Sequence, residues 1–295
     1  MAKSQFNVSE LVTSSIIKAM EDGTPPWRKP WTGGNTGPAF PKRSNGEPYR
    51  GINVLMLWLA ADERGYTSAS WFTYKQALDL GAQVRKGEKS SNVVKYGTVE
   101  KEDESGNEKL IPYTRAYRVF NADQIDGLPE HFYRKPEPAR DMGTEANAEL
   151  DALFAAMGVP VVTTSEARAY YSVTKDSIHM PPVETFLSAS DYYGTLAHEG
   201  AHATGHKSRL DRFEKFQSKK QYAFEELIAE IAASMMAVEF GFKPDFAQSA
   251  AYVEGWLKAL GEDDRAIFRA ASEAQQAVDF IKAAFAKKQT EQEAA

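Results

Sequence analysis

Cysteine is absent from this sequence of 295 residues, and histidine occurs only five times. The lack of cysteine excludes disulfide bonds and thiolate ligands, so any metal site must use histidine and carboxylate side chains. No apolar run reaches the ~18–20 residues that a membrane-spanning helix needs. The first residues, MAKSQFNVSELV, contain no apolar signal core. We therefore expect a soluble cytoplasmic protein with no membrane partner.

The charge of the chain is divided unevenly along its length. Residues 1–135 contain 19 Lys and Arg against 16 Asp and Glu, a net charge of +3, whereas residues 136–295 contain 16 against 25, a net charge of −9. Such asymmetry suggests a different partner for each half. The stretch RKPEPARDMGTE combines prolines and charges without apolar periodicity and is typical of a linker. We predict a first domain at 1–135, a linker at 136–145 and a second domain at 146–295.

Hydrophobic periodicity predicts an α+β fold in both parts. For the first domain it predicts three helices, at residues 11–20, 53–64 and 73–80. It also predicts one β-hairpin, whose strands are residues 92–101 and 109–121. For the second domain it predicts short strands between 159 and 182, and helices at about 144–157, 189–204, 222–240, 245–259 and 264–284. We expect the polar tail after residue 284 to fray. A small sheet would thus precede a helical bundle.

The stretch TLAHEGAHATGH, residues 195–206, contains the motif HExxH. On a helix, His198 and His202 are four residues apart and lie on one face, so both imidazoles can reach one metal ion. Glu199 is displaced around the helix and is placed to act as a general base in hydrolysis. The alternative is an amphipathic helix whose His and Glu side chains are merely solvated.

A catalytic zinc ion needs a third protein ligand and one open position. The longer motif HExxHxxGxxH fails here, because Ser208 stands where its third histidine should be. We predict Glu226, on the next helix, as the third ligand. Glu230, four residues later, would accept a hydrogen bond from a ligand histidine, although these two roles can be exchanged. The alternative is that Glu225, Glu226 and Glu230 are simply solvated side chains on one helix face.

These residues predict one Zn²⁺ ion, with other divalent metals as alternatives, and hydrolysis of a peptide bond. Glu199 would take a proton from water and pass it to the leaving amine. A tyrosine or histidine would stabilise the oxyanion, and the candidates are Tyr192, Tyr193 and His179.

Aromatic residues alternate with basic residues in the first domain, a pattern that suits single-stranded DNA, because bases stack on rings and cations hold phosphates. The candidate DNA-binding residues are Trp27, Arg28, Lys29, Trp31, Lys42, Arg43, Arg50, Trp71, Tyr74, Lys75, Arg85, Lys86 and Lys89. The alternative is that the aromatics are core residues and the cations are solvated.

Several long strings resemble the ArdC-type antirestriction proteins of conjugative plasmids: PWRKPW, YRGIN, WFTYKQALDLGAQVRKGEKS, YRVFNADQIDGLP, HEGAHATGH and EELIAE. They are collinear over nearly the whole chain. The resemblance implies a first domain that binds single-stranded DNA, and a second that is a zincin-like metallopeptidase of the polyvalent-protein type. In this family His198, Glu199 and His202 match the metal motif, and EELIAE matches a downstream acidic motif.

The resemblance further implies that the protein protects incoming plasmid DNA from host restriction in the cytoplasm of the recipient cell. Its partners would be single-stranded DNA and a protein substrate or a host restriction enzyme. Two alternatives are a DNA-binding module whose metal site is structural, and a plain intracellular zinc peptidase.

Overall fold

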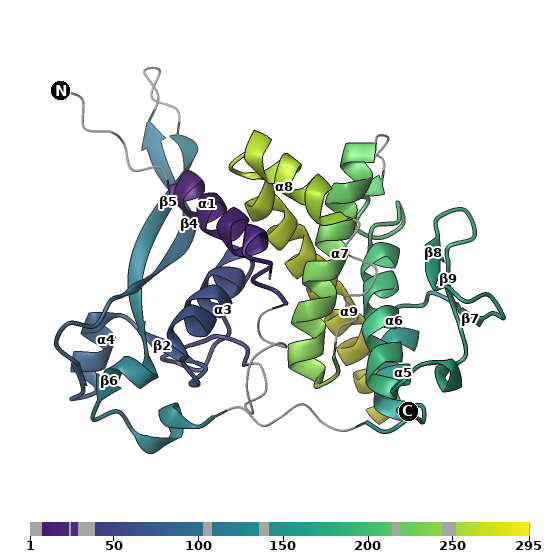
Figure 1. The fold of residues 1–295 in the computed structure, drawn as a ribbon, viewed down its shortest axis with the longest axis horizontal. Coiled ribbons are helices and arrows are strands. Elements are labelled where there is room, and N and C mark those ends of the chain that lie inside the picture. Colours follow the sequence, from purple (N-terminus) through teal and green to yellow (C-terminus); the bar gives the residue numbers. More distant parts are fainter. Residues whose placement is uncertain are drawn as a thin grey trace. The chain divides into compact units, whose positions relative to one another are not determined.

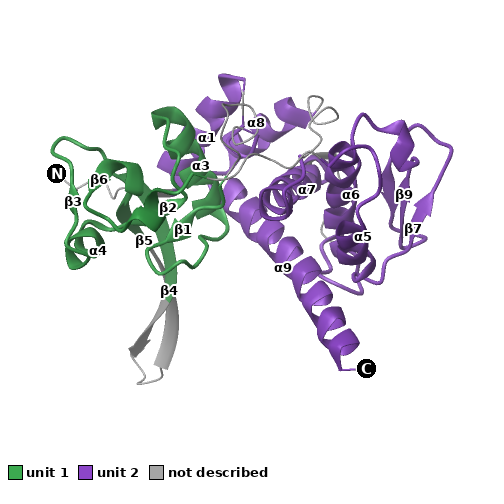
Figure 2. Ribbon diagram, turned by 90° about the horizontal axis from the view of Figure 1, so that it is seen from below, with its two compact units in different colours: residues 1–8, 39–136 green, residues 9–38, 137–295 purple. Residues whose placement is uncertain are grey.

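The computed structural model of the chain describes residues 8–23, 25–28, 39–102, 108–135, 142–213, 219–243 and 252–294. The chain forms two compact units, one of Met1–Val8 and Ala39–Pro136 and the other of Ser9–Pro38 and Glu137–Ala295 (Figure 2). Both units combine helices with small sheets, so the predicted α+β class is confirmed. Within the described ranges no helix is long and apolar enough to cross a membrane.

The first unit contains a four-stranded sheet in the order β1-β2-β5-β4. Its strands are β1 (Lys42–Arg43), β2 (Ser70–Phe72), β4 (Ser91–Glu102) and β5 (Glu108–Asn121). Strands β4 and β5 are antiparallel, with Asn92 opposite Arg118, which confirms the predicted hairpin. The stretch EDESGN between these strands predicts the hairpin turn at 105–107, which lies outside the described residues. A second, two-stranded sheet pairs β3 (Gln83–Val84) with β6 (Ile125–Asp126).

Two helices accompany these sheets. Helix α3 (Ile52–Arg64) packs on β4 and ends at Gly65, whose φ of 69° lies in the left-handed region that glycine tolerates. Helix α4 (Tyr74–Asp79) begins with a capping box, in which the Thr73 side chain accepts from the Gln76 backbone and the Gln76 side chain accepts from Thr73. Short 3₁₀ turns follow at η1 (Ala122–Gln124) and η2 (Glu130–Tyr133).

The second unit contains a three-stranded sheet in the order β7-β9-β8. Strand β9 (Ser177–Met180) is central, with β7 (Val161–Thr163) parallel on one side and β8 (Tyr170–Ser172) antiparallel on the other. The strand-like runs at 167–173 and 176–182 predict a hairpin, and the pairing of β8 with β9 confirms it. Strand β8 is an edge strand, and both β8 and β9 contact helix α6.

Helices build the rest of this unit (Figure 1). They are α5 (Ala148–Ala155), η3 (Val183–Thr185), α6 (Ala189–Thr204), α7 (Lys219–Phe240), α8 (Val253–Glu262) and α9 (Ala266–Glu293). Helix α7 packs against both α6 and α9, and its Leu227, Ile231 and Met235 are fully buried. The prediction that the chain frays after residue 284 is wrong. Because the tail lacks Gly and Pro and is rich in Ala, Lys, Gln and Glu, its residues favour a helix.

The N-terminal helix α1 (Val8–Glu21) is part of the second unit from Ser9 onward. The Thr13 hydroxyl donates a hydrogen bond to the backbone oxygen of Asp264, over 2.6 Å. Residues 9–38 thus belong to the second unit, whereas we predict a first domain at 1–135. The cause is long-range packing, which the local composition of residues 9–38 does not reveal.

Candidate metal centre

Helix α6 carries the HExxH motif and has well-defined ends. The Ser188 side chain caps its start by accepting a hydrogen bond from the backbone nitrogen of Asp191, over 3.2 Å. At its end, a Cβ on Gly205 would lie 3.0 Å from Nη2 of Arg212 and 3.0 Å from Cζ of Phe213. Glycine therefore leaves the space in which the chain turns back against the helix.

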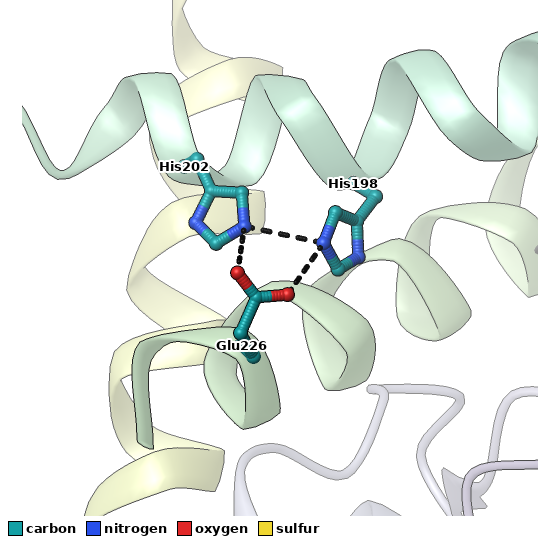
Figure 3. A group of neighbouring side chains, drawn as sticks. All are labelled: His198, His202 and Glu226. Atoms are coloured by element: carbon teal, nitrogen blue, oxygen red, sulfur yellow. Dashed lines mark hydrogen bonds and ion pairs between the residues drawn. The ribbon is translucent and has the colours of Figure 1, made fainter. Parts of the chain in front are cut away.

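The two histidines of the motif converge, as predicted (Figure 3). The Nε2 atoms of His198 and His202 are 3.1 Å apart. Glu226 of α7 reaches both of them, with 3.3 Å from its Oε2 to Nε2 of His198 and 3.4 Å from its Oε1 to Nε2 of His202. One ligand atom from each residue lies within 4.8 Å of the others. Two imidazole nitrogens and a carboxylate are a donor set that suits Zn²⁺, so the three side chains could hold a metal ion.

Glu225, rather than the predicted Glu230, lies beside the second ring nitrogen of His202. Its Oε1 lies 3.3 Å from Nδ1 of His202, on the side of the ring that faces away from the cluster. A carboxylate at this nitrogen fixes the tautomer and leaves Nε2 free for an ion. The sequence held a signal for this residue, because Glu225 directly precedes Glu226.

Glu230 points elsewhere. Its Oε1 accepts hydrogen bonds from Nε1 of Trp27 and from Nε of Arg28, both over 2.8 Å. The Glu230 side chain is 2% exposed and that of Arg28 is 16% exposed, so this ion pair is partly buried. The prediction that Glu230 supports a ligand histidine is therefore corrected. Glu230 follows Glu226 by one helical turn, which displaces it along α7 from the histidines.

Glu199 is buried beside the cluster. Its Oε2 accepts a hydrogen bond from the backbone nitrogen of Tyr171 in the edge strand β8, over 2.8 Å. This contact fixes the carboxylate between the helix and the sheet. Glu199 is not a member of the three-residue group, which agrees with the role of a base rather than a ligand.

The electrostatics of the cluster favour a bound cation. Burial lowers the pKa of His202, but hydrogen bonds to Glu225 and Glu226 outweigh it and raise that pKa to about 10. Burial raises the pKa of Glu226, while hydrogen bonds with His198 and His202 bring it well below its usual range. In the metal-free protein, a proton on His202 therefore balances negative charge on the neighbouring carboxylates. A metal ion would have to displace that proton.

The candidate DNA-binding residues that the structure describes are buried, paired with acidic residues, or exposed. Trp27 and Trp71 are buried, with 0% and 2% exposure, so neither ring offers a face to a base. Trp27 instead meets the Trp256 ring edge-to-face at 6.0 Å. Lys29 and Trp31 lie outside the described residues. These two buried tryptophans correct our assignment, because an aromatic in a basic, Pro-rich string can equally well be a core anchor.

The candidate cations differ in how they are paired. Arg28 is bound to Glu230, and Arg85 is paired with Glu88 at 2.9 Å and with Asp126 at 3.3 Å. The other described candidates, including the aromatic Tyr74, are exposed in the first unit: Lys42, Arg43, Arg50, Tyr74, Lys75, Lys86 and Lys89. Of these, Arg43 forms an ion pair with Glu47 at 3.3 Å. Arg43 also lies over the ring of Tyr49, 5.5 Å from its centroid.

Two protein families match the sequence. Residues 148–273 match the zincin-like metallopeptidase family. This range contains His198, His202 and Glu226. Residues 6–120 match the N-terminal domain of anti-restriction factor ArdC.

Three curated relatives are similar over most of the chain. Two are Escherichia coli proteins named DNA primase TraC, which are 38% and 37% identical over 99% and 96% of this chain. The chain spans only 28% and 20% of the length of these two relatives. The third is the uncharacterized protein y4eC of Sinorhizobium fredii, which is 36% identical over 94% of this chain and 92% of its own length.

Two crystal structures of the antirestriction ArdC protein from plasmid R388 share the fold. The metal-free structure is 60% identical, with a TM-score of 0.89 over 96% of this chain and 99% of that chain. The Mn(II)-bound structure is 58% identical, with a TM-score of 0.85 over 95% and 99% of the two chains. Identity at this level over whole chains, together with both family matches, shows that the chain belongs to the ArdC family of antirestriction proteins.

Proposed function

We propose that the second unit is a zinc-dependent peptidase and that the first unit binds single-stranded DNA. The convergence of His198, His202 and Glu226 beside the buried Glu199 carries this proposal. Two histidines and a glutamate leave one coordination position of Zn²⁺ open, as catalytic sites require. The Mn(II)-bound structure of the R388 relative supports a divalent metal at such a site and makes Mn²⁺ the alternative to Zn²⁺.

The residues of the cluster divide the chemistry between them. His198, His202 and Glu226 hold the ion, and a bound Zn²⁺ supplies a Lewis acid that makes water a nucleophile near neutral pH. Glu199 accepts a proton from the attacking water and delivers it to the leaving nitrogen. A C–O bond thereby replaces the peptide C–N bond, and the acid and amine products balance the water consumed.

The edge strand β8 supports a peptide as the substrate. It is the outer strand of the β7-β9-β8 sheet and contacts α6. An extended peptide can add to such an edge through backbone hydrogen bonds. The backbone nitrogen of Tyr171 already contacts Glu199, so a peptide aligned on β8 would run beside the general base.

The first unit supports the DNA-binding part of the proposal. Residues 6–120, which match the N-terminal domain of anti-restriction factor ArdC, include most of this unit, and exposed lysines and arginines lie on its surface. Among the candidate aromatics that the structure describes, Trp27 and Trp71 are buried, and Tyr74 is available for a base at 47% exposure. Phosphate contacts, rather than extensive stacking, would therefore provide most of the affinity.

We further propose that the protein protects the DNA strand that enters a recipient cell during plasmid conjugation, and that it acts in the cytoplasm. Single-stranded DNA held by the first unit would be shielded from restriction enzymes that require a duplex. A host restriction enzyme is one candidate protein substrate for the second unit.

Fluorescence anisotropy tests the DNA-binding part. The full chain is titrated against a labelled single strand and against its duplex at fixed salt. We expect tighter binding to the single strand and an affinity that falls as salt rises, because phosphate contacts release counterions. Equal affinity for both DNAs would refute this part and leave the peptidase proposal standing.

Mass spectrometry of a peptide library tests the peptidase part. The Zn²⁺-loaded protein is expected to produce cleavage, and Glu199→Ala, with the three ligands intact, is expected to produce none. Cleavage by the variant at the wild-type rate would remove Glu199 from the mechanism. Metal binding without cleavage by either protein would favour a structural metal site.

A further inference from the structure

An exposed tyrosine stands on the same helix as the third ligand. Tyr222 precedes Glu226 by four residues on α7, so the two side chains lie on one face of the helix. Tyr222 is 54% exposed, whereas Glu226 is only 6% exposed. The tyrosine thus lies at the border between the buried cluster and solvent.

Two contacts fix the position of this tyrosine. Burial, together with hydrogen bonding to the carboxylate of Glu226 and to Tyr252, raises the pKa of the Tyr222 hydroxyl. Its ring lies 6.0 Å from the ring of Tyr252, tilted by 56°, and Tyr252 in turn stacks on Trp256 at 6.4 Å. Trp256 is anchored to α7 by a 2.8 Å hydrogen bond to the backbone oxygen of Ala223. A row of aromatic rings therefore holds the Tyr222 hydroxyl against the cluster.

The aromatic residues that we considered from the sequence are committed to other contacts. The Tyr193 ring is fully buried, and its hydroxyl hydrogen-bonds with Asn147 and Asp151. Nε2 of His179 lies 3.0 Å from the Ser177 hydroxyl, and its ring stacks on that of Tyr170 at 4.6 Å. Tyr192 packs edge-to-face on Phe186 at 5.3 Å and on Tyr193 at 5.1 Å.

We propose that Tyr222 is the catalytic residue that donates a hydrogen bond to the carbonyl oxygen of the substrate at the metal. This assignment rests on the peptidase function proposed above. Negative charge grows on that oxygen as water attacks the carbonyl carbon, and a donor placed there stabilises the charge. Tyr222 keeps its proton throughout, since Glu199 performs the proton transfer. If Glu226 shares its charge with a bound ion, the oxygen of the substrate would be the stronger acceptor for the Tyr222 hydroxyl.

Acetohydroxamate is the probe that tests this assignment without turnover. It binds an open metal position through anionic oxygen, where the Tyr222 hydroxyl would meet it. The full chain is loaded with Co²⁺, whose visible absorption reports both metal uptake and hydroxamate binding. Wild type is compared with Tyr222→Phe, and Tyr192→Phe serves as the matched control from the same unit.

We expect Tyr222→Phe to bind Co²⁺ as wild type does but to bind acetohydroxamate about tenfold more weakly, the usual effect of one hydrogen bond to a charged group. Tyr192→Phe should match wild type in both measurements. Two results would overturn the assignment. If Tyr222→Phe lost metal affinity but kept its hydroxamate affinity, the tyrosine would only position Glu226. If hydroxamate affinity fell in Tyr192→Phe instead, the donor would be Tyr192.

The wild-type measurement separates this assignment from the proposed function. A wild-type protein that takes up no Co²⁺ refutes the metal site itself, and with it any role for Tyr222 at a metal. A wild type that binds both Co²⁺ and acetohydroxamate, with Tyr222→Phe unchanged in both, refutes the tyrosine alone.

Discussion

Arg212 donates two hydrogen bonds to the carboxylate of Glu225, over 3.1 Å from Nε and over 2.7 Å from Nη2. Their side chains are 1% and 3% exposed. A buried carboxylate is costly unless a countercharge meets it, so Arg212 keeps Glu225 ionised. Glu225 in turn lies 3.3 Å from Nδ1 of His202. The orientation of a candidate metal ligand therefore depends on an arginine from the loop that follows α6.

Glu225→Gln should weaken metal binding about 10–100-fold, the usual effect of removing a carboxylate that supports a ligand histidine. The neutral amide holds Nδ1–H of His202 less strongly and leaves the charge of Arg212 uncompensated. Competition with a chromogenic chelator measures the change. Glu239→Gln is the control, because Glu239 lies on the same helix but is exposed and paired with Lys282. Equal metal affinity in the two variants would contradict the proposal that Glu225 orients His202 for metal binding.

Trp27→Phe should destabilise the second unit by about 1–3 kcal/mol, because it removes one hydrogen bond from a buried carboxylate. Phenylalanine retains most of the bulk that packs against Trp256, so the loss reports mainly on the contact with Glu230. Urea unfolding of the full chain gives the free energy. Tyr74→Phe, at an exposed position, is the control and should stay within about 0.5 kcal/mol of wild type. A similarly small change in Trp27→Phe would mean that the hydrogen bond from Trp27 to Glu230 contributes little to the free energy of unfolding.

The elements that the sequence predicted correctly are those with local signals. Four-residue spacing on α6 placed His198 and His202 on one face of the helix. Alternation in residues 92–101 and 109–121 predicted the β4–β5 hairpin. Each of these patterns needs only the geometry of one element or of one adjacent pair.

The elements that the sequence did not reveal depend on contacts between distant segments. The rotation of α7 against α6 decides which of Glu225 and Glu230 meets His202, and no spacing along α7 fixes that rotation. Arg212 carries no motif, and its burial follows from the turn at Gly205. Trp27 is separated from Glu230 by 203 positions, so its burial could not be distinguished from an exposed, base-stacking position.

The ion pair of Asp176 and Arg209 should make the stability of the β8–β9 hairpin depend on acid pH. Hydrogen bonds from Arg209 lower the pKa of Asp176 to about 2, against the opposing effect of burial. A carboxylate whose folded pKa is depressed stabilises the fold above its ordinary pKa of 3.8, and this contribution is lost as the pH falls toward about 2. Asp176→Asn is the matched variant, because asparagine also tolerates the φ of 48° at this position.

The expected outcome is a difference in unfolding free energy between wild type and Asp176→Asn that is present near neutral pH and shrinks below about pH 4. Urea unfolding across this range gives the difference at each pH. A difference that stays constant down to about pH 2 would show that the charge of Asp176 contributes nothing, and that only its hydrogen-bonding shape matters.

Zn²⁺ should raise the melting temperature of the full chain, and more strongly as the pH rises. Ligand that binds the folded state at 100 times its dissociation constant adds about 2.7 kcal/mol of stability. In the metal-free protein the pKa of His202 is raised to about 10, so its proton stabilises the fold fully below its ordinary pKa of 6.5 and this contribution is lost as the pH rises toward 10. An ion that displaces that proton gains about tenfold in affinity for each pH unit over this window.

Scanning calorimetry with and without Zn²⁺, at several pH values, measures the effect. Glu199→Gln keeps the three ligands and should respond as wild type, whereas His198→Ala should respond far less; an equal shift in His198→Ala would place the ion at another site.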